Sequence, residues 1–412
     1  MNKLKVLQYY LQAKRRMRFS RPKLDRFQSY HREKIAQFAK TKSLFYRKGL
    51  GGIISKKEMM ENFSSFNTKS IDREAAFALA FDAEKKRDFT AQLDGVTVGL
   101  SSGTSGNRGL FLVSEEERLS WCGHVLARVL PKAPWRRQKI AFFLRANSPL
   151  YETVKSSKLE FAYFDLLENP DSLYERVKAY QPDVLVAPPS MLRMLIGSCS
   201  PERVVSVAET LFSTDRKQLE EGFGQQIFQV YQCTEGFLGF TCSHGTLHLN
   251  EDLISVEKEY LSERSFVPII TDLFRKTQPI IRYRLDDVLV EKEGPCPCGC
   301  VFQPIERIEG RCDDILHVQM AGGKTKPVFP DFVCRKIVAA SEEITDYAVV
   351  QKALDEWEIY LKPMQNQPVS KQFHELFEQL GCVPPKLSFT NQMPPRDPGA
   401  KLRRIMNEGI KC

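Results

Sequence analysis

The chain has no long hydrophobic run. Apolar residues make up 42% of it, but no stretch approaches the roughly 20 apolar residues that a membrane-spanning helix needs. Near the N-terminus, Lys5, Gln8 and Gln12 interrupt the apolar residues, so that no signal-peptide core forms and no cleavage site follows. The sequence therefore predicts no transmembrane segment, and the cytoplasm is the expected compartment.

Other familiar patterns are also missing. The chain has no internal repeat, no low-complexity tract, no paired C-x-x-C motif and no complete Gly-x-x-x-x-Gly-Lys-[Ser/Thr] sequence of a Walker A loop. With 412 residues, of which 27% are charged, it has the length and composition of a globular protein with two or more domains.

Cysteine, in contrast, is abundant. The chain has eleven cysteines, and an odd number without a secretory signal favours free thiols and a metal site over disulfides. Six Cys and His residues form two close groups, namely Cys242, His244 and His248, then Cys296, Cys298 and Cys300. Because thiolate and imidazole suit tetrahedral zinc, we expect a structural zinc on Cys242, His248, Cys296 and Cys298. His244 and Cys300 are alternative ligands, and a set of free cysteines on a turn is the other interpretation.

Positive charge is concentrated early in the chain. The formal net charge is +9, and seven cations lie close together: Lys14, Arg15, Arg16, Arg18, Arg21, Lys23 and Arg26. Such a run can bind nucleic acid or an anionic membrane, but it is more often a solvated helix face. We favour the solvated face and expect no nucleic-acid partner. A zinc-stabilised, non-enzymatic binding protein that uses this basic face is the alternative.

A run rich in hydroxyl groups and glycine follows the strand-like residues 96–100. It reads Ser101, Ser102, Gly103, Thr104, Ser105, Gly106, Asn107, Arg108 and Gly109. Glycines let backbone N–H groups turn toward an anion, hydroxyls add donors, and Arg108 supplies positive charge. The run predicts a phosphate-binding loop.

Four further segments follow this loop in order. They are residues 231–236 (YQCTEG), 281–287 (IRYRLDD), 310–314 (GRCDD) and 399–404 (GAKLRR). From about residue 95 to the C-terminus, the five segments resemble the successive core motifs of the adenylate-forming superfamily, which includes acyl-CoA ligases and the adenylation domains of peptide synthetases. Two departures affect loop geometry: Leu285-Asp286 replaces the usual Thr-Gly, and Ala400 separates Gly399 from Lys401.

Three local features resemble one branch of that superfamily. They are residues 182–190, 241–252 and 328–330, and the branch includes phenylacetate-CoA ligases, coenzyme F synthetase-like proteins and indoleacetate-lysine ligase. The resemblance implies that ATP and Mg²⁺ activate a carboxylic acid to an acyl-adenylate with release of pyrophosphate. An aryl or arylacetic acid is favoured, for which Phe237, Leu238 and Phe240 are candidate pocket residues. The acyl acceptor, CoA or an amine, stays open, and so does the oligomeric state.

The predicted fold is α/β. Strand-like runs at residues 140–144, 184–187, 204–207 and 226–231 alternate with helix-like segments, which favours a parallel sheet. We expect a mostly helical part over residues 1–90, an α/β core that binds ATP and the acid over 91–310, and a small α+β domain over 311–412. The resemblance implies that this last domain is mobile and that Asp313 is its hinge.

The same chemistry assigns roles to single residues, because attack on the α-phosphate depends on positioning and on neutralising phosphate charge. Lys401 is expected to bridge the carboxylate and the α-phosphate, Thr234 to contact that phosphate, and Glu235 to bind Mg²⁺. Their other interpretations are a basic tail for Lys401 and a surface carboxylate for Glu235.

The remaining candidates bind the nucleotide. Asp287 is expected to accept hydrogen bonds from the ribose, with a helix cap or a salt bridge to Arg284 as the other interpretation. Ala208 and Glu209 are expected to flank the adenine, and Tyr231 to stack on it. Pyrophosphate would be held by Ser102, Thr104, Ser105 and Arg108. The set is completed by Ser101, Gly103, Gly106, Gln232 and Arg311.

Overall fold

The computed structural model describes most of the chain. Its described residues are 2–86, 88, 90–101, 109–144, 157–166, 168–311, 314–328, 330–341, 343–393 and 403–408. The predicted phosphate loop from Ser102 to Arg108, the hinge candidate Asp313 and the catalytic candidate Lys401 lie outside these residues. Within them, no helix is long and apolar enough to cross a membrane.

The N-terminal part is helical. Its helices are α1 (Asn2–Arg16), α2 (Arg21–Lys42), α3 (Leu44–Arg47), α4 (Lys56–Glu61), α5 (Phe63–Phe66) and α6 (Arg73–Lys86). In α1, Val6, Tyr10 and Ala13 are buried in the same apolar cluster as residues of the large sheet. This spacing of three and four residues puts them on one face of the helix, so α1 is part of the main core.

A small sheet and a long helix follow. The sheet consists of β1 (Gln92–Leu93), β2 (Val96–Leu100) and β3 (Leu110–Ser114), all antiparallel. Helix α7 (Glu115–Val129) begins in a capping box, in which the Ser114 hydroxyl accepts from the Glu117 N–H and the Glu117 carboxylate accepts from the Ser114 N–H. Three glutamates in its first turn suit the positive end of the helix dipole.

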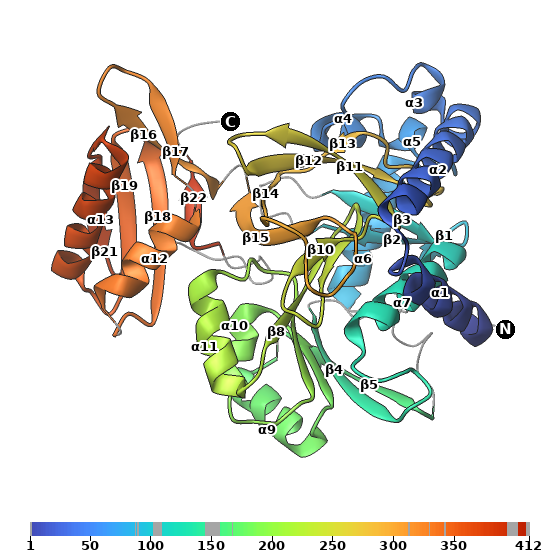
Figure 1. Cartoon of the computed structure of the whole chain (residues 1–412), viewed down its shortest axis with the longest axis horizontal. Helices are drawn as coiled ribbons and strands as arrows, with labels where there is room; N and C mark the ends of the chain where they lie inside the picture. Colours follow the sequence, from blue (N-terminus) through green and yellow to red (C-terminus); the bar gives the residue numbers. More distant parts are fainter. Residues whose placement is uncertain are drawn as a thin grey trace.

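The large sheet has twelve strands, and Figure 1 shows it at the centre of the molecule. Its parallel half runs in the order β8 (Ile227–Cys233), β7 (Arg203–Ser206), β6 (Val184–Ala187), β4 (Gln138–Leu144), β5 (Leu159–Asp165). The crossover helices are α9 (Pro170–Tyr180), α10 (Pro189–Met194) and α11 (Ser213–Phe223). All four residues of β6 are buried, as expected of a strand covered on both faces. The four strand predictions in this region are confirmed.

At β8 the sheet changes direction, because β9 (Gly236–Thr241) pairs with it antiparallel. The antiparallel half continues through five strands: β10 (Leu247–Leu249), β15 (Pro304–Arg311), β14 (Asp287–Glu291), β12 (Ser265–Asp272) and β11 (Ile254–Tyr260). A short strand, β13 (Tyr283–Arg284), also pairs with β12. Neighbouring strands in this half can be far apart in the sequence, since β10 lies between β9 and β15.

The C-terminal residues form two further sheets, seen on the left in Figure 1. One contains β16 (Leu316–Met320), β17 (Thr325–Val328) and β20 (Cys382–Val383), and the other β21 (Lys386–Thr390), β19 (Glu356–Lys362), β18 (Asp346–Ala353) and β22 (Ile405–Asn407). Helices α12 (Pro330–Ala340) and α13 (Asn366–Leu380) complete the unit. Its core is a separate apolar cluster around Trp357, Phe373 and Phe377. The predicted fold class is confirmed.

Candidate functional site

The parallel strands end at a cavity. Its lining includes Pro189 after β6, Ala208 and Glu209 after β7, and Gln232 and Cys233 at the end of β8. The carboxyl ends of parallel strands are where open α/β sheets bind ligands. Four of the predicted nucleotide-binding residues therefore share one cavity with Asp287: Ala208, Glu209, Tyr231 and Gln232.

Tyr231 and Asp287 are directly linked across this cavity. The Tyr231 hydroxyl donates to Asp287 Oδ2 at 2.7 Å. Burial, followed by the negative charge of Asp287, raises the pKa of Tyr231 well above its usual value, so the hydroxyl keeps its proton and stays a donor. Tyr231 thus orients the carboxylate. The alternative partner for Asp287, Arg284, forms an ion pair with Glu259 at 2.8 Å.

Glu235 is a buried carboxylate held by three neighbours. Tyr283 donates its hydroxyl to Oε1 at 2.9 Å, and Thr234 donates its hydroxyl to Oε2 at 2.8 Å. Burial favours the neutral acid, but hydrogen bonds from Cys233, Thr234 and Tyr283 outweigh it and hold the pKa of Glu235 below its usual value. The side chain is 8% exposed, which excludes the interpretation as a surface carboxylate. It is a buried anion, and such a group is a suitable ligand for a cation.

Ala208 and Glu209 form a turn with unusual backbone geometry. Ala208 has a φ of 67°, in the left-handed region that a side chain with a Cβ seldom adopts. The Glu209 carboxylate accepts from the Ser190 backbone N–H at 3.1 Å and from its hydroxyl at 2.9 Å. Glu209 therefore satisfies a free N–H in the first turn of α10 as well as lining the cavity.

The predicted phosphate loop joins β2 to β3. Of its residues only Ser101 and Gly109 are described, and their backbones meet: the Ser101 N–H donates to the Gly109 carbonyl, and the Gly109 N–H donates to Ser101 Oγ, both at 2.7 Å. The two ends of the loop are therefore fixed together. The backbone of Arg311 lies opposite Asp287 in the β14–β15 ladder.

The opposite wall of the cavity comes from the C-terminal part of the chain. Asp314, Arg403 and Arg404 all line it. Arg403 Nε donates to Asp314 Oδ1 at 2.8 Å. Since Arg403 and Arg404 come two and three residues after Lys401 in the sequence, the end of the GAKLRR motif reaches the cavity of the nucleotide-binding candidates.

An ion-pair cluster that sequence reasoning missed joins this wall to the large sheet. Asp215, in the first turn of α11, accepts from Arg193 Nη1 at 2.6 Å and from Arg404 Nη1 at 3.2 Å. Asp215 and Arg404 are 7% and 8% exposed. An acid in the first turn of a helix is an ordinary helix-start signal, and Arg404 stands in a basic run, so neither residue suggested a partner.

The Cys and His groups meet at one place, beside β10 and the segment that leads into β15. The ligand atoms of Cys242, His248, Cys296 and Cys298 all lie within 4.8 Å of one another. The Sγ atoms of Cys242 and Cys296 are 3.7 Å apart, and Cys298 Sγ lies 3.4 Å from His248 Nε2. Tetrahedral zinc with bonds of about 2.3 Å places its sulfur ligands about 3.8 Å apart, so the geometry fits zinc.

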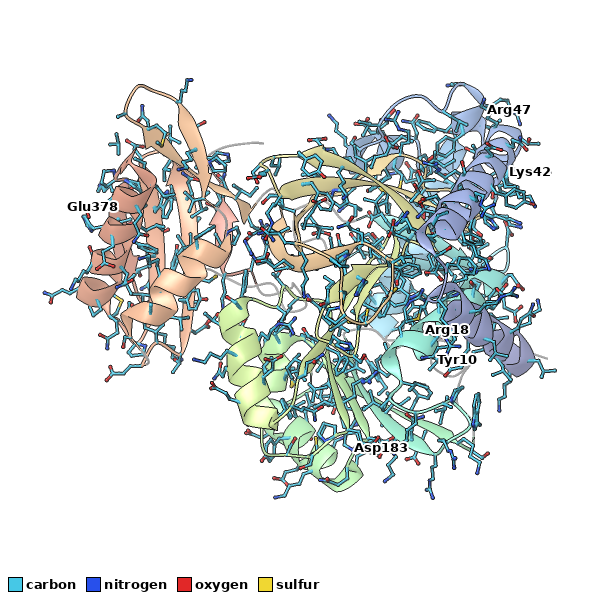
Figure 2. The ribbon with its side chains drawn as sticks, in the orientation of Figure 1. Tyr10, Arg18, Lys42, Arg47, Asp183 and Glu378 are labelled. Atoms are coloured by element: carbon cyan, nitrogen blue, oxygen red, sulfur yellow. The ribbon has the colours of Figure 1, made fainter. Side chains whose placement is uncertain are left out.

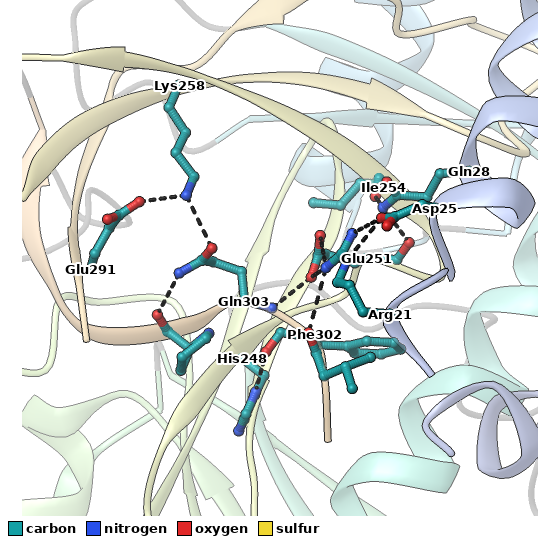
Figure 3. Close-up of polar contacts among 12 residues, drawn as sticks. Arg21, Asp25, Gln28, His248, Glu251, Ile254, Lys258, Glu291, Phe302 and Gln303 are labelled. Carbon is teal, nitrogen blue, oxygen red and sulfur yellow. Dashed lines mark hydrogen bonds and ion pairs between the residues drawn. The ribbon is translucent and has the colours of Figure 1, made fainter. Parts of the chain in front are cut away.

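The surroundings of the cluster orient its imidazole. His248 Nδ1 lies 2.8 Å from the Phe302 carbonyl, a contact that requires a proton on Nδ1 and leaves the Nε2 lone pair facing the thiols. Figure 3 shows this contact beside a network in which Glu251 binds Arg21 at 2.9 Å and the Gln303 N–H at 2.6 Å. His244 and Cys300, the alternative ligands, are not part of the cluster among the residues described.

Two aromatic residues predicted to line the acid pocket, Phe237 and Phe240, instead pack against a buried arginine. The Arg128 guanidinium lies over the rings of both Phe237 and Phe240, whose centroids are 5.4 and 5.2 Å from its central carbon. Arg128 in turn forms an ion pair with Asp252 at 2.5 Å, and both side chains are fully buried. The arginine of a buried ion pair, which the sequence did not suggest, therefore packs on both rings.

The chain has the fold of the adenylate-forming ligases, as comparison with solved structures shows. It superposes on 2-hydroxyisobutyryl-CoA ligase in the postadenylation state with a TM-score of 0.68 and 14% identity, over 93% of this chain and 88% of that one. The amide bond synthetase of Marinactinospora thermotolerans matches with a TM-score of 0.55 and 14% identity, over 74% and 68%.

Two curated proteins are similar in sequence, whereas no family model matches. Protein CapK of Staphylococcus aureus is 25% identical over 287 residues, which cover 66% of this chain and 62% of CapK. The phenylacetate-coenzyme A ligase of Thermus thermophilus is 24% identical over 279 residues, which cover 56% and 61%. The chain thus spans about three fifths of the length of these relatives. The resemblance to adenylate-forming ligases and to the phenylacetate-CoA ligase branch is confirmed.

Proposed function

We propose that this protein activates a carboxylic acid with ATP to form an acyl-adenylate, and then transfers the acyl group to an acceptor. The observation that carries the proposal is the cavity. It brings together Tyr231 and Asp287, the turn at Ala208 and Glu209, and Arg403 and Arg404. These residues come from motifs far apart in the sequence, so a shared ligand explains why they converge.

The first half-reaction forms one bond and breaks one. A carboxylate oxygen of the acid attacks the α-phosphorus of ATP, the bond between the α- and β-phosphates breaks, and pyrophosphate leaves with the electron pair. In the second half-reaction, a thiol or an amine attacks the acyl carbon, loses its proton, and AMP departs. Both steps depend on charge compensation at phosphate oxygens.

The position of each residue suggests its role in these two steps. Asp287, oriented by Tyr231, would accept hydrogen bonds from the ribose hydroxyls, while Ala208 and Glu209 would flank the adenine. Thr234 would contact the α-phosphate, and the ionised Glu235 would hold Mg²⁺. The metal ion, when bound, neutralises charge on the phosphate oxygens. Gln232 lies on the same rim.

The segments outside the described residues complete the assignment. Ser102, Thr104, Ser105 and Arg108 would hold the departing pyrophosphate, with Ser101 closing their loop. Lys401 would bridge the carboxylate and the α-phosphate, and Asp313 would act as the hinge. The position of Arg403 and Arg404 at the cavity supports the role of Lys401.

The acid we propose is aryl or arylacetic, because phenylacetate-coenzyme A ligase is among the relatives. For the acceptor, both CoA and an amine have support, since similar folds are found in a CoA ligase and in an amide bond synthetase. Because the buried Arg128 already packs on Phe237 and Phe240, we expect the acid to contact side chains other than these two rings.

We also propose a structural zinc at Cys242, His248, Cys296 and Cys298. A closed set of four protein ligands leaves no open position for a substrate. The bound ion would tie β10 to the segment before β15. It would therefore stabilise the antiparallel half of the sheet, from which Asp287 reaches the cavity.

Exchange of labelled pyrophosphate into ATP tests the first half-reaction directly. The purified chain is assayed with Mg²⁺, without an acceptor, against aryl, arylacetic, fatty and amino acids. Exchange with one class of acid, abolished by Lys401→Ala, is the expected result. No exchange with any acid by a folded protein would contradict the proposal. If Lys401→Ala is inactive while Glu235→Ala stays fully active, the magnesium assignment is wrong.

A further inference from the structure

The outer face of α1 combines exposed leucines with positive charge. Leu4 and Leu11 are 74% and 52% exposed, and Leu7 lies between them on the same face, since the three recur at helical spacing. Together with Gln8, Gln12 and Arg15 they line a shallow hollow along the helix. On the neighbouring face, Val6, Tyr10 and Ala13 are buried. Leu7 is partly buried against the core, so Leu4 and Leu11 are the two leucines that are not needed for folding against it.

An exposed tryptophan lies beside Tyr10 of the same helix. Trp135 is 57% exposed, and its ring meets the edge of Tyr10 with centroids 6.3 Å apart. Arg136 and Arg137 follow it and are also exposed. We call Leu4, Leu7, Leu11 and Trp135 the α1 patch. In Figure 1, α1 lies at the right edge of the molecule, and Figure 2 labels Tyr10 and Arg18 there.

The charge around the α1 patch has one sign. Residues 2–24 contain eight Lys and Arg and no Asp or Glu. Lys5 pairs with Glu116, and Arg21 with Asp25 and Glu251. Among the described residues, six of the eight have no ion pair with a carboxylate, namely Lys3, Lys14, Arg15, Arg16, Arg18 and Lys23. Burial and the positive charges of Arg203, Arg128 and Arg18 lower the pKa of Lys14, which shows how closely cations are crowded here.

We propose that the α1 patch is a docking surface for an anionic membrane, on which α1 lies flat with its leucines in the interface. Leucine and tryptophan on one face of a helix, with lysine and arginine at its borders, have the chemistry of interfacial helices. Anionic headgroups would neutralise the crowded cations, each of which adds to the attraction. A nucleic acid is a poorer partner for the α1 patch, because it would contact the cations and leave the leucines exposed to water. A second copy of the chain is also a poorer partner, because its own positive charge would repel this surface.

Vesicle flotation tests the membrane proposal with the full chain. The probes are vesicles of phosphatidylcholine with and without phosphatidylglycerol. We expect flotation with the anionic vesicles alone, and about tenfold or greater weakening by Leu4→Ser combined with Leu11→Ser, because each leucine loses its transfer into the interface. Lys3→Glu with Arg15→Glu should weaken binding similarly. The emission of Trp135 should shift to the blue on binding, a change absent in Trp135→Phe.

Matched variants control for general effects. Leu44→Ser removes a leucine that is 54% exposed on α3, and Lys371→Glu with Lys386→Glu changes the same charge on the C-terminal unit. Both should bind vesicles as the unmodified chain does. The proposal is overturned if anionic vesicles do not float the protein, or if the leucine variant binds them unchanged. It is also overturned if the patch variants abolish a dimer seen by sedimentation velocity while vesicle binding is absent.

Discussion

Asp287 carries the nucleotide assignment at the scale of single residues. Asparagine at this position keeps the shape but removes the charge, and Tyr231→Phe removes the hydroxyl that orients the carboxylate at 2.7 Å. Because a hydrogen bond to a charged group contributes about 1.5–3 kcal/mol, we expect Asp287→Asn to raise the KM for ATP about tenfold or more, and Tyr231→Phe somewhat less. Pyrophosphate exchange at varied ATP concentration measures both.

Asp286→Asn is the matched control for Asp287, since Asp286 is its neighbour in the sequence and does not line the cavity. Its KM for ATP should stay within about twofold of the unmodified value, a change of less than about 0.5 kcal/mol. A larger effect of Asp286→Asn than of Asp287→Asn would show that the wrong aspartate has been assigned to the ribose.

The metal site makes a second prediction at this scale. Elemental analysis of the purified chain should find one zinc per molecule, and Cys296→Ser should lose it together with several degrees of thermal stability, because a structural zinc contributes to folding free energy. Cys300→Ser and His244→Ala should keep the ion, since both residues lie outside the cluster. Retention of zinc by Cys296→Ser would contradict the ligand set.

At the scale of elements, one glutamate fastens the start of α7 to a distant turn. Besides the capping box, Glu117 accepts from the Lys276 and Thr277 N–H groups at 2.6 and 2.8 Å. Burial raises its pKa, but hydrogen bonds from Thr277 and Ser114 outweigh this and leave it below the usual value. A lowered pKa in the folded state means that this stabilisation is present at neutral pH and is lost as pH falls through the folded-state pKa.

We therefore expect Glu117→Gln to lower the free energy of unfolding by about 2 kcal/mol at pH 7, the cost of weakened bonds to a buried charge. The difference from the unmodified protein should shrink in the acid range. Urea titrations at several pH values measure it. Glu115→Gln, on the exposed side of the same helix turn, is the control, and an equal loss with this variant would point to the helix dipole instead.

The elements also show what the sequence could predict. Short apolar runs such as residues 184–187 identify the parallel strands because a strand covered on both faces must be apolar throughout. The order of the antiparallel half could not be predicted, since β10 pairs with β9 nearby and with β15 more than 50 residues later. Local patterns say that a strand forms but not which partner it finds.

The candidate site likewise has some residues that the sequence could predict and others that it could not. Residues such as Glu235 and Asp287 stand in motifs whose chemistry can be recognised from neighbours in the sequence. Asp215 and Arg404 are 189 residues apart and have ordinary surroundings in the chain, so only the folded structure shows that they meet. The same is true of Arg128 and Asp252, because an isolated charge gives no sign that it is buried with a partner.

At the scale of the whole molecule, Asp215 links the large sheet to the C-terminal unit. Arg404 directly precedes β22, and its guanidinium also lies over the Tyr347 ring at 4.8 Å. If Asp215 is neutralised, Arg404 remains buried without its carboxylate, and breaking such a pair costs about 3–5 kcal/mol. The C-terminal unit can avoid this cost by leaving its place beside the cavity.

We expect Asp215→Asn to lower the rate of pyrophosphate exchange about tenfold or more at saturating ATP, and to increase the radius of gyration in small-angle scattering. Asp171→Asn, at an exposed position of α9, should change neither. The part of the chain that contains the twelve-stranded sheet should keep its thermal unfolding transition in both variants. A normal scattering curve for Asp215→Asn together with a normal exchange rate would show that this ion pair does not position the C-terminal unit.

The cluster of Cys242, His248, Cys296 and Cys298 also determines which part of the protein peroxide would damage first. Peroxide oxidises cysteine sulfur, and three cysteines are gathered around His248, with the Cys242 and Cys296 sulfurs 3.7 Å apart. Damage would begin there, on the antiparallel half of the sheet, while the carboxylates and cations of the cavity stay chemically intact. Peroxide would thus inactivate the protein by loosening its scaffold, and a thiol reductant given with the proposed zinc would restore the proposed activity.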